Sequence, residues 1–323
     1  MPEVRVEYRA TPASGSIELA DGEADGAAGL GSCFSAATPN RTTERIRRNG
    51  ARREIRPYAD CMHTTVFPSD ESFRTGEPQR DAPSTRRPWF TAIVFALVPV
   101  AFTASGSAAA EVLQLSDSLS ALVIASAALT SAGAGFALMA FSRQRLPAFG
   151  LQRPESLRAV AWLLPALATV AVAAATQTAG FDARGWLPYA ALAVAVALNE
   201  EFWFRGIILT ALRIRGTTSA IYGSAALFGI LHLTNLAGGE DLAGTGLQVA
   251  FALVFGVAAA QLAVLTHSIW PAIAWHALWD FTNFLSGNRT TPLALAGVGL
   301  SISVVLGYAF VLRLRIQRSE QRA

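Results

Sequence analysis

The side chains of this sequence that could do chemistry lie inside long apolar stretches. Glu200 and Glu201 are adjacent in residues 187–212, a stretch built otherwise mostly of Ala, Leu, Val, Ile and aromatic residues, and Arg205 follows four residues after Glu201. A charged side chain at the depth of a bilayer costs on the order of 2.5–3.5 kcal/mol on insertion scales. Ionisable residues in such a stretch therefore indicate a functional site.

The spacing of these charges on a helix determines which of them can cooperate. Glu201 and Arg205 are four residues apart, so they share one face of a helix and can form an ion pair that holds the helix in place. Glu200 points about 100° away from Glu201, so we expect it to have other neighbours and to be suited to take a proton from water. A purely structural ion pair remains the alternative for Glu201 and Arg205.

Two further apolar stretches carry polar residues at helical spacing. Phe228 and His232 are four residues apart, as are His276 and Asp280, and Asn283 lies about one turn beyond Asp280. Residues four apart meet on one helix face. Two histidines in apolar stretches, together with an unpaired glutamate, favour a catalytic site over a structural cluster.

The elements that must position these residues are apolar segments of membrane-spanning length. Only 15% of the chain is charged and 52% is hydrophobic, whereas a soluble domain carries about 25% charged residues. Eight segments lie near the ~20 residues that cross a bilayer: 89–110, 119–141, 159–178, 187–212, 220–236, 247–266, 269–285 and 293–312. The sequence predicts an all-α integral membrane protein with eight transmembrane helices around an intramembrane catalytic site.

The composition divides the chain into regions of different character. Residues 1–88 are polar, lack helical or strand periodicity, and predict a disordered leader that the chemistry does not need. Cys33 and Cys61 lie in this leader, and two such widely spaced cysteines indicate reduced thiols rather than a disulfide framework. The remaining predicted regions are the membrane domain, 89–313, with a motif core at 187–285, and a basic cytoplasmic tail, 314–323.

Arginines at the segment ends predict the orientation. Those on one side of the predicted membrane are Arg86, Arg87, Arg143, Arg145, Arg153, Arg158, Arg213, Arg215, Arg313, Arg315, Arg318 and Arg322. The other side has only Arg184 and Arg289. The positive-inside rule then places both termini in the cytoplasm. Arginine without any lysine, with abundant Ala and Gly, is typical of GC-rich coding and indicates a bacterial cell membrane. A formal charge of +3 is too small to indicate a nucleic-acid partner.

The three polar motifs, in this order, resemble the motif set of the CPBP family of intramembrane glutamic endopeptidases, the CAAX-processing and bacteriocin-immunity (Abi) proteases. The motifs read Glu200-Glu201-x-x-x-Arg205, Phe228-x-x-x-His232 and His276-x-x-x-Asp280. The resemblance covers residues 187–284. It implies that Glu200 is the general base that activates water, helped by His232, and that Glu201 and Arg205 brace the site.

The resemblance also implies that His276 and Asp280 stabilise the oxyanion of a tetrahedral intermediate. Many relatives have Asn where this chain has Asp280, and an ionised carboxylate cannot donate a hydrogen bond to an oxyanion. Either Asp280 is protonated, or it orients His276 and leaves the donation to that ring. Asn283 could supply an amide, although its spacing does not fit the family motif.

The expected function is therefore a metal-independent protease that cleaves membrane-anchored or lipid-anchored peptides in the bilayer, without a cofactor. Two histidines and a glutamate could instead bind zinc and leave a position open, but no His-Glu-x-x-His string is present. A proton-coupled transporter also places carboxylates and histidines at mid-membrane. A non-catalytic bacteriocin-immunity protein is the third alternative.

Overall fold

The computed structural model describes residues 87–154, 161–177, 185–286 and 291–322. The predicted leader lies outside these ranges up to residue 86, as do both cysteines. Within the described ranges every regular element is a helix and there is no strand, which confirms the all-α prediction. Apolar segments of this length, free of alternating polarity, can bury their backbone groups only by forming hydrogen bonds within one helix.

Each predicted apolar segment corresponds to one helix or to consecutive helical elements. These elements are α1 (Pro88–Val112), α2 (Asp117–Ala140), η2 (Leu146–Phe149), α4 (Leu164–Gln177), α5 (Trp186–Glu201), η4 (Phe202–Ile208), α6 (Leu209–Leu212), η5 (Arg213–Arg215), α7 (Thr217–Leu231), η6 (His232–Leu236), α8 (Leu242–Thr266), α9 (Trp270–Ser286) and α10 (Pro292–Glu320). Within the described residues, the predicted count of eight helical segments is therefore confirmed.

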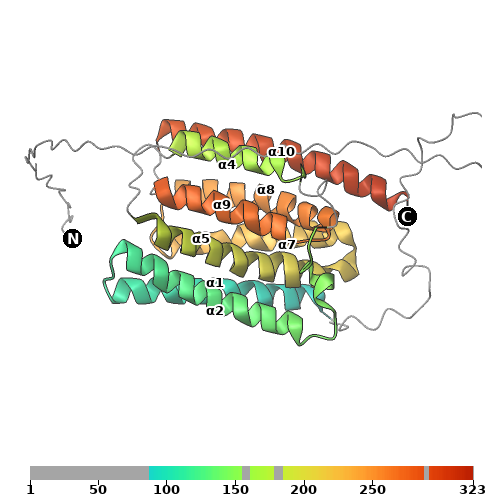
Figure 1. Cartoon of the computed structure of the whole chain (residues 1–323), viewed down its shortest axis with the longest axis horizontal. Helices are drawn as coiled ribbons and strands as arrows, with labels where there is room; N and C mark the ends of the chain where they lie inside the picture. The colour runs from blue at the N-terminus through green and yellow to red at the C-terminus, as the bar shows by residue number, and fades with distance from the viewer. Residues whose placement is uncertain (1–86, 155–160, 178–184, 287–290, 323) are drawn as a thin grey trace, which may run out of the picture. The chain divides into compact units, whose positions relative to one another are not determined.

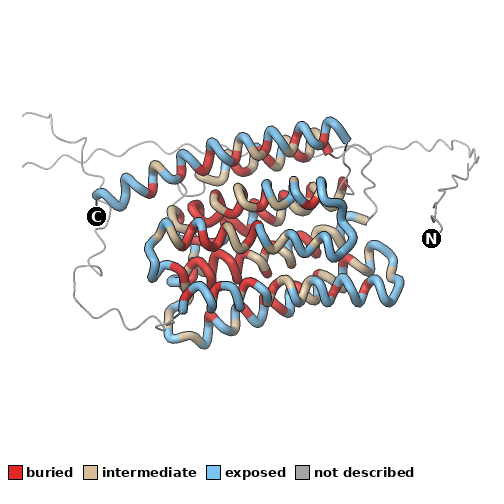
Figure 2. The backbone as a smooth tube through the Cα atoms, turned by 180° about the vertical axis from the view of Figure 1, so that it is seen from behind, coloured by how far each residue is buried: buried red, intermediate tan, exposed pale blue. Residues whose placement is uncertain are grey.

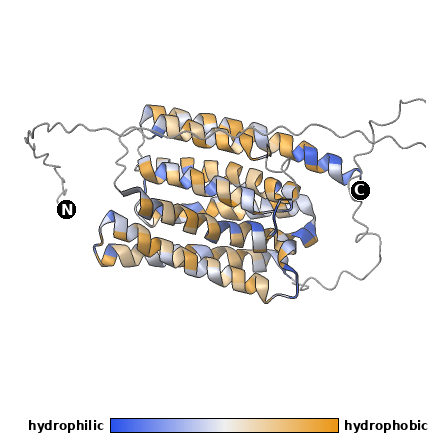
Figure 3. Cartoon of the chain, in the orientation of Figure 1, coloured by the Kyte–Doolittle hydropathy of each residue, from blue (hydrophilic) through white to orange (hydrophobic). Residues whose placement is uncertain are grey.

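Four of these helices, α1, α2, α8 and α10, are long and apolar enough to cross a membrane by length and composition. The other four segments are built on shorter α-helices, although α5 runs without a break into η4 and α6, and α7 runs into η6. Large apolar side chains such as Phe90, Leu97 and Phe310 face outward, and hydrophobic residues cover the helices over most of their length (Figure 3). These features together indicate a membrane protein.

Among the described helices, α5 and its continuation, η4 and α6, lie in the interior of the helix bundle. α2 packs against α1 and α5, and α5 packs against α9 (Figure 1). α10 packs against α4 and α8, and α8 also packs against α7. Buried residues concentrate on the facing sides of these central helices (Figure 2). The residues that could do chemistry are on α5, η4 and α9, with His232 on η6.

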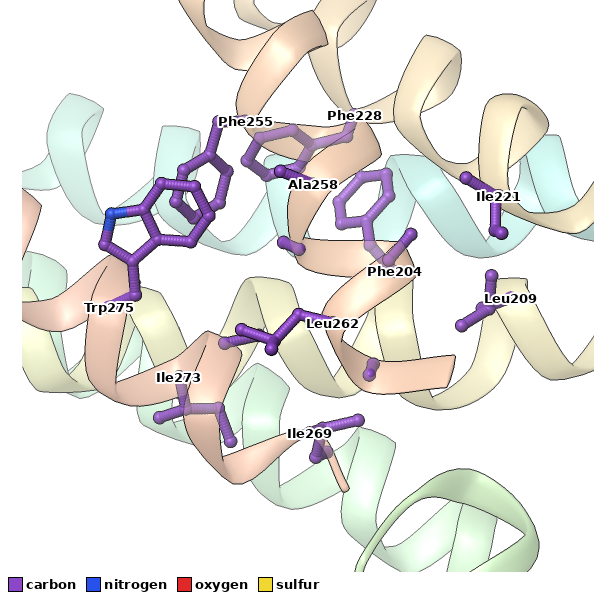
Figure 4. Close-up of a cluster of buried hydrophobic side chains, with 14 of the residues drawn as sticks. Phe204, Leu209, Ile221, Phe228, Phe255, Ala258, Leu262, Ile269, Ile273 and Trp275 are labelled. Atoms are coloured by element: carbon purple, nitrogen blue, oxygen red, sulfur yellow. The ribbon is translucent and has the colours of Figure 1, made fainter. Parts of the chain in front are cut away.

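Aromatic rings from four elements fill the core next to the polar motifs. Phe204 of η4 meets Phe228 of α7 with 5.1 Å between ring centroids, and Phe255 of α8 lies 4.3 Å from Trp275 of α9 (Figure 4). All four side chains are 2% exposed or less. Edge-on and tilted contacts of this kind contribute about 0.5–1.5 kcal/mol each beyond the area they bury. The rings therefore fix the relative positions of η4, α7, α8 and α9.

Two glycines allow α7 and α8 to approach closely. A Cβ on Gly256 would lie 3.1 Å from the Cα atom of Ala225, and a Cβ on Gly229 would lie 2.5 Å from the side chain of Leu253. Small residues are common where membrane helices cross, because the backbones gain packing contacts there.

Gly256→Leu is expected to destabilise the protein by about 1–3 kcal/mol, since a leucine at this crossing must push α7 away from α8. Gly246→Leu is the matched control on the same helix, because Gly246 is exposed and nothing lies within 4 Å of a Cβ there. The measurement is thermal unfolding of both variants in detergent. Equal unfolding midpoints for the two variants would show that the α7–α8 contact does not depend on Gly256.

Candidate active site

The helix that carries the glutamate pair changes its winding directly after the pair. α5 ends at Glu201, and Phe202–Ile208 form a π-helix in which the Leu209 N–H donates to the carbonyl oxygen of Phe204, five residues back. π-helices are rare and are frequently found at functional sites. The prediction of one regular helix over residues 187–212 is therefore wrong in this part.

The π-helix is held by its neighbours. All seven of its residues are buried, and the hydroxyl of Ser224 on α7 donates to the carbonyl oxygen of Phe204 at 2.8 Å. A Cβ on Gly206 would lie 3.0 Å from the Met139 sulfur, so the small residue lets α2 pack closely. These tertiary contacts compensate for the weaker geometry of the wide turn.

Glu201 and Arg205 form a fully buried ion pair, with 2.9 Å between Arg205 Nη1 and Glu201 Oε1 and 0% side-chain exposure for both. The Arg205 guanidinium also lies over the Phe228 ring, with its Cζ atom 4.2 Å from the ring centroid. A cation over an aromatic face is stabilised by about 2 kcal/mol or more when both are desolvated. The ion pair thus joins η4 to α5 and, through Phe228, to α7.

The His276 ring of α9 lies among three carboxylates. Its Nδ1 atom is 2.9 Å from Glu201 Oε1, and its Nε2 atom is 3.5 Å both from Glu200 Oε2 and from Asp280 Oδ2. Glu200 was expected to face away from the partners of Glu201, and this expectation is wrong, because α9 packs against α5 where one ring reaches both carboxylates. An ionised carboxylate only accepts hydrogen bonds, so Nδ1 donates to Glu201.

The cluster is open on one side and closed on the other. The side chains of Glu200 and Asp280 are 21% and 18% exposed, His276 is 7% exposed, and Glu201 and Arg205 are 0% exposed. Glu200 and Asp280 are therefore the members of the cluster that are accessible at the protein surface, whereas the ion pair lies behind the ring as its support.

His232 is the first residue of η6, where α7 ends. Its Nδ1 atom lies 2.9 Å from the carbonyl oxygen of Phe228, and a carbonyl oxygen only accepts, so Nδ1 carries the proton and Nε2 of the neutral ring is an acceptor. The Phe228 ring meets His232 edge-on at 4.9 Å and His276 edge-on at 5.9 Å. The ion pairs and hydrogen bonds of the described residues join Glu200 to His276 and not to His232.

Asn283 does not reach the cluster through its amide. Its Nδ2 atom donates to the carbonyl oxygen of Trp279, four residues back on α9, at 2.7 Å. One of the two amide N–H groups is thus bonded to the helix backbone. Because no hydrogen bond among the described residues joins this amide to the cluster, a role for Asn283 as an oxyanion donor stays a prediction.

Sequence reasoning did not single out Phe255, which contacts the site from α8. Its ring lies 5.0 Å from the His276 ring and 5.6 Å from the Arg205 Cζ atom. An aromatic residue in an apolar segment carries no signal that separates this position from any other core position. Within the described ranges, no group of three or more His, Cys, Asp and Glu side chains has the arrangement of a metal site.

The fold and this cluster together define an all-helical membrane protein with an acidic and histidine-containing site among its central helices. Residues 182–282 match the family model described as type II CAAX prenyl endopeptidase Rce1-like. The match contains every residue of the three motifs, and the resemblance to the CAAX-protease family is confirmed over residues 182–282. No curated protein matches the chain.

Proposed function

We propose that this protein is an intramembrane endopeptidase that hydrolyses peptide bonds of membrane-associated or lipid-anchored substrates with water activated by Glu200. The observation that carries the proposal is the position of the His276 ring between Glu200 and Asp280 on the open side of the cluster. The family match supports a CAAX-protease-type peptidase as the general class. Glutamate as the water activator is the part of the proposal that the resemblance of the motifs implies and that the family match leaves to be tested.

In the proposed reaction, a water molecule beside Glu200 loses a proton to the carboxylate as its oxygen attacks the substrate carbonyl carbon. The tetrahedral intermediate carries a negative charge on the former carbonyl oxygen. The C–N bond then breaks, and the leaving amine takes the proton back from Glu200. His232 assists by accepting a hydrogen bond from the same water at Nε2, the ring atom that its bond to Phe228 leaves free.

His276 and Asp280 have the proposed task of stabilising the oxyanion. A preorganised donor at an oxyanion typically contributes about 10²–10³-fold in rate. Asp280 Oδ2 lies 3.5 Å from His276 Nε2, beyond the usual hydrogen-bond distance, so the Nε2–H stays available to an oxyanion. Glu201 holds the ring from its other nitrogen and is in turn held by Arg205.

The setting that we propose is a bacterial cell membrane, crossed by eight helical segments with both termini in the cytoplasm. The four helices of full spanning length and the outward apolar side chains support the insertion. The arginine distribution supports the orientation. The proposed substrate is a membrane-anchored peptide or protein, because only such a substrate reaches a site between helices in the bilayer.

The test is an assay of the purified full chain in liposomes with a panel of membrane-anchored peptides, with and without a strong chelator. Cleavage that the chelator leaves unchanged is the expected result. Cleavage that stops on chelation would replace the glutamate mechanism by a metal-dependent one. Proton-coupled solute flux without any cleavage would replace the peptidase by a transporter, and protection against a bacteriocin without cleavage would indicate the immunity protein.

Asp280→Asn is expected to keep the cleavage rate within about tenfold of the wild type, because an asparagine oxygen can still accept from the His276 ring and its amide can donate to an oxyanion. Asp280→Ala removes both groups and is expected to lower the rate by about 10²-fold. Steady-state kcat/KM on one peptide distinguishes the two variants. Equal losses in both would mean that the negative charge of Asp280 is the required property.

A further inference from the structure

A groove lies on the side of α8 that faces away from the acidic and histidine-containing cluster. Its volume is about 330 Å³, at the low end of the range of roughly 300–1,000 Å³ for ligand pockets. Val254, Val257 and Gln261 of α8 line it. Around the helix axis these positions lie roughly 100–160° from Phe255. The Phe255 ring contacts His276. The groove is therefore separate from the proposed catalytic site.

The groove is apolar along its length and polar at one end. Leu306 and Phe310 of α10 line the apolar part and are 53% and 63% exposed. At the other end, Arg313 Nη1 donates to the hydroxyl oxygen of Tyr222 at 3.2 Å, and its Cζ atom lies 6.0 Å from the Tyr222 ring centroid. The lining thus has the polarity of a lipid, with an apolar chain and a charged head.

A buried amide lies toward the same end. α7 and α8 pack together and are joined by a short connection, so they run in opposite directions and the start of α7 lies beside the end of α8. Tyr222 is near the start of α7 and Gln261 is near the end of α8, so both lie toward the end marked by Arg313. Gln261 is 2% exposed and its Oε1 atom is fully buried, so this amide lies behind the groove surface and is not a contact for a bound molecule.

The charge at this end of α10 is positive and not neutralised locally. Arg313, Arg315 and Arg318 follow one another in the last turns of the helix, which are hydrophilic (Figure 3). No described carboxylate forms an ion pair with Arg313, and Arg315 lies over the Trp162 ring at 5.5 Å. Arginines next to Tyr and Trp at a helix end are typical of the membrane surface, where they attract anionic lipids.

We propose that this groove binds one anionic phospholipid. Its phosphate accepts hydrogen bonds from Arg313, and one acyl chain lies along Leu306 and Phe310. The proposal rests on the membrane placement proposed above but not on the peptidase activity. A lipid of this kind supplies the anion that Arg313 lacks among the described residues, which a purely apolar molecule does not.

The test measures lipid binding directly. The full chain is equilibrated in detergent with equal amounts of phosphatidylglycerol and phosphatidylcholine, and native mass spectrometry counts the bound molecules of each. The wild type is expected to retain one phosphatidylglycerol in preference to phosphatidylcholine. Arg313→Gln is expected to weaken that binding about tenfold or more, because it removes a charge-assisted contact to the phosphate.

Three further variants make the result specific. Arg318→Gln removes an exposed arginine of the same helix end that does not line the groove, and it should change binding less than twofold. Leu306→Trp, at an exposed position of the lining, should displace the acyl chain and reduce binding. Glu200→Gln should bind the lipid like the wild type, which separates this result from the fate of the proposed activity.

Two outcomes would overturn the proposal. Equal retention of phosphatidylglycerol and phosphatidylcholine by the wild type would mean that the groove holds only surrounding bilayer lipid. An equal loss in Arg318→Gln and Arg313→Gln would mean that the total surface charge, and not the groove, attracts the lipid. Arg313 and Arg318 are both exposed, so neither variant is expected to impair folding.

Discussion

Glu200→Gln is expected to lower kcat/KM for a membrane-anchored peptide by about 10²–10⁴-fold, the usual contribution of a general base. A glutamine has nearly the shape of the glutamate but does not take a proton from water. Its Oε1 atom can keep the position of the carboxylate oxygen near His276 Nε2, which lies 3.5 Å from the Glu200 carboxylate. The fold is therefore expected to remain, and the loss should be in catalysis alone. The measurement is cleavage kinetics together with the thermal unfolding midpoint.

Glu111→Gln is the matched control for this change. Glu111 is exposed in the last turn of α1, so the same chemical substitution there should leave both the rate and the unfolding midpoint unchanged. Wild-type turnover by Glu200→Gln would contradict the assignment of Glu200 as the base. A fall in activity that merely follows a fall in the folded fraction would assign Glu200 a structural role.

The helices and the pairs within one helix were predictable from the sequence because they depend on local spacing. Apolar length alone located the eight segments, and the four-residue spacing of Glu201 and Arg205 anticipated the ion pair found at 2.9 Å. The spacing of His276 and Asp280 likewise anticipated that they share a face, and their side chains lie 3.5 Å apart. The His276–Asp280 relation follows from 3.6 residues per turn, whereas the Glu201–Arg205 pair forms although Arg205 lies in the π-helix.

Relations between helices were not predictable in the same way. Helical spacing correctly separated Glu200 from Glu201 on α5, but it could not show that His276 of another helix lies between the two carboxylates. The π-helix after Glu201 is held by Ser224 and by the close approach of Met139 to Gly206. Both contacts come from segments distant in the chain, so the local sequence carries no sign of them.

The partner of a polar side chain was the least predictable feature. Asn283 is close enough in sequence to Asp280 to join the cluster, but its amide donates to the carbonyl oxygen of Trp279 instead. An asparagine inside a helix can satisfy its amide on the preceding turn, and sequence spacing does not distinguish this from a tertiary contact. The same limit applies to His232, whose Nδ1 is bonded to Phe228.

Glu201→Leu is expected to destabilise the folded protein by about 3–5 kcal/mol, the usual loss when one partner of a buried ion pair is removed. The Arg205 guanidinium would remain 1% exposed, with only the Phe228 and Phe255 rings and the more distant Glu200 to offset its charge. His276 would also lose the acceptor that orients its Nδ1 atom. The measurement is unfolding in detergent by increasing denaturant.

Two companion variants separate the buried charge from the lost packing. Glu201→Gln keeps an oxygen that can accept from both Arg205 and His276, so it should cost clearly less than Glu201→Leu. The double variant Glu201→Leu with Arg205→Met removes both charges, and it should be more stable than Glu201→Leu alone, because no unpaired charge is left in the core. Glu240→Leu, at an exposed loop position, should leave the unfolding transition nearly unchanged. The double variant could instead be less stable than Glu201→Leu by the full cost of a second core substitution. That result would mean that the charges of Glu201 and Arg205 are not coupled, and that the aromatic packing around Phe228 braces the site.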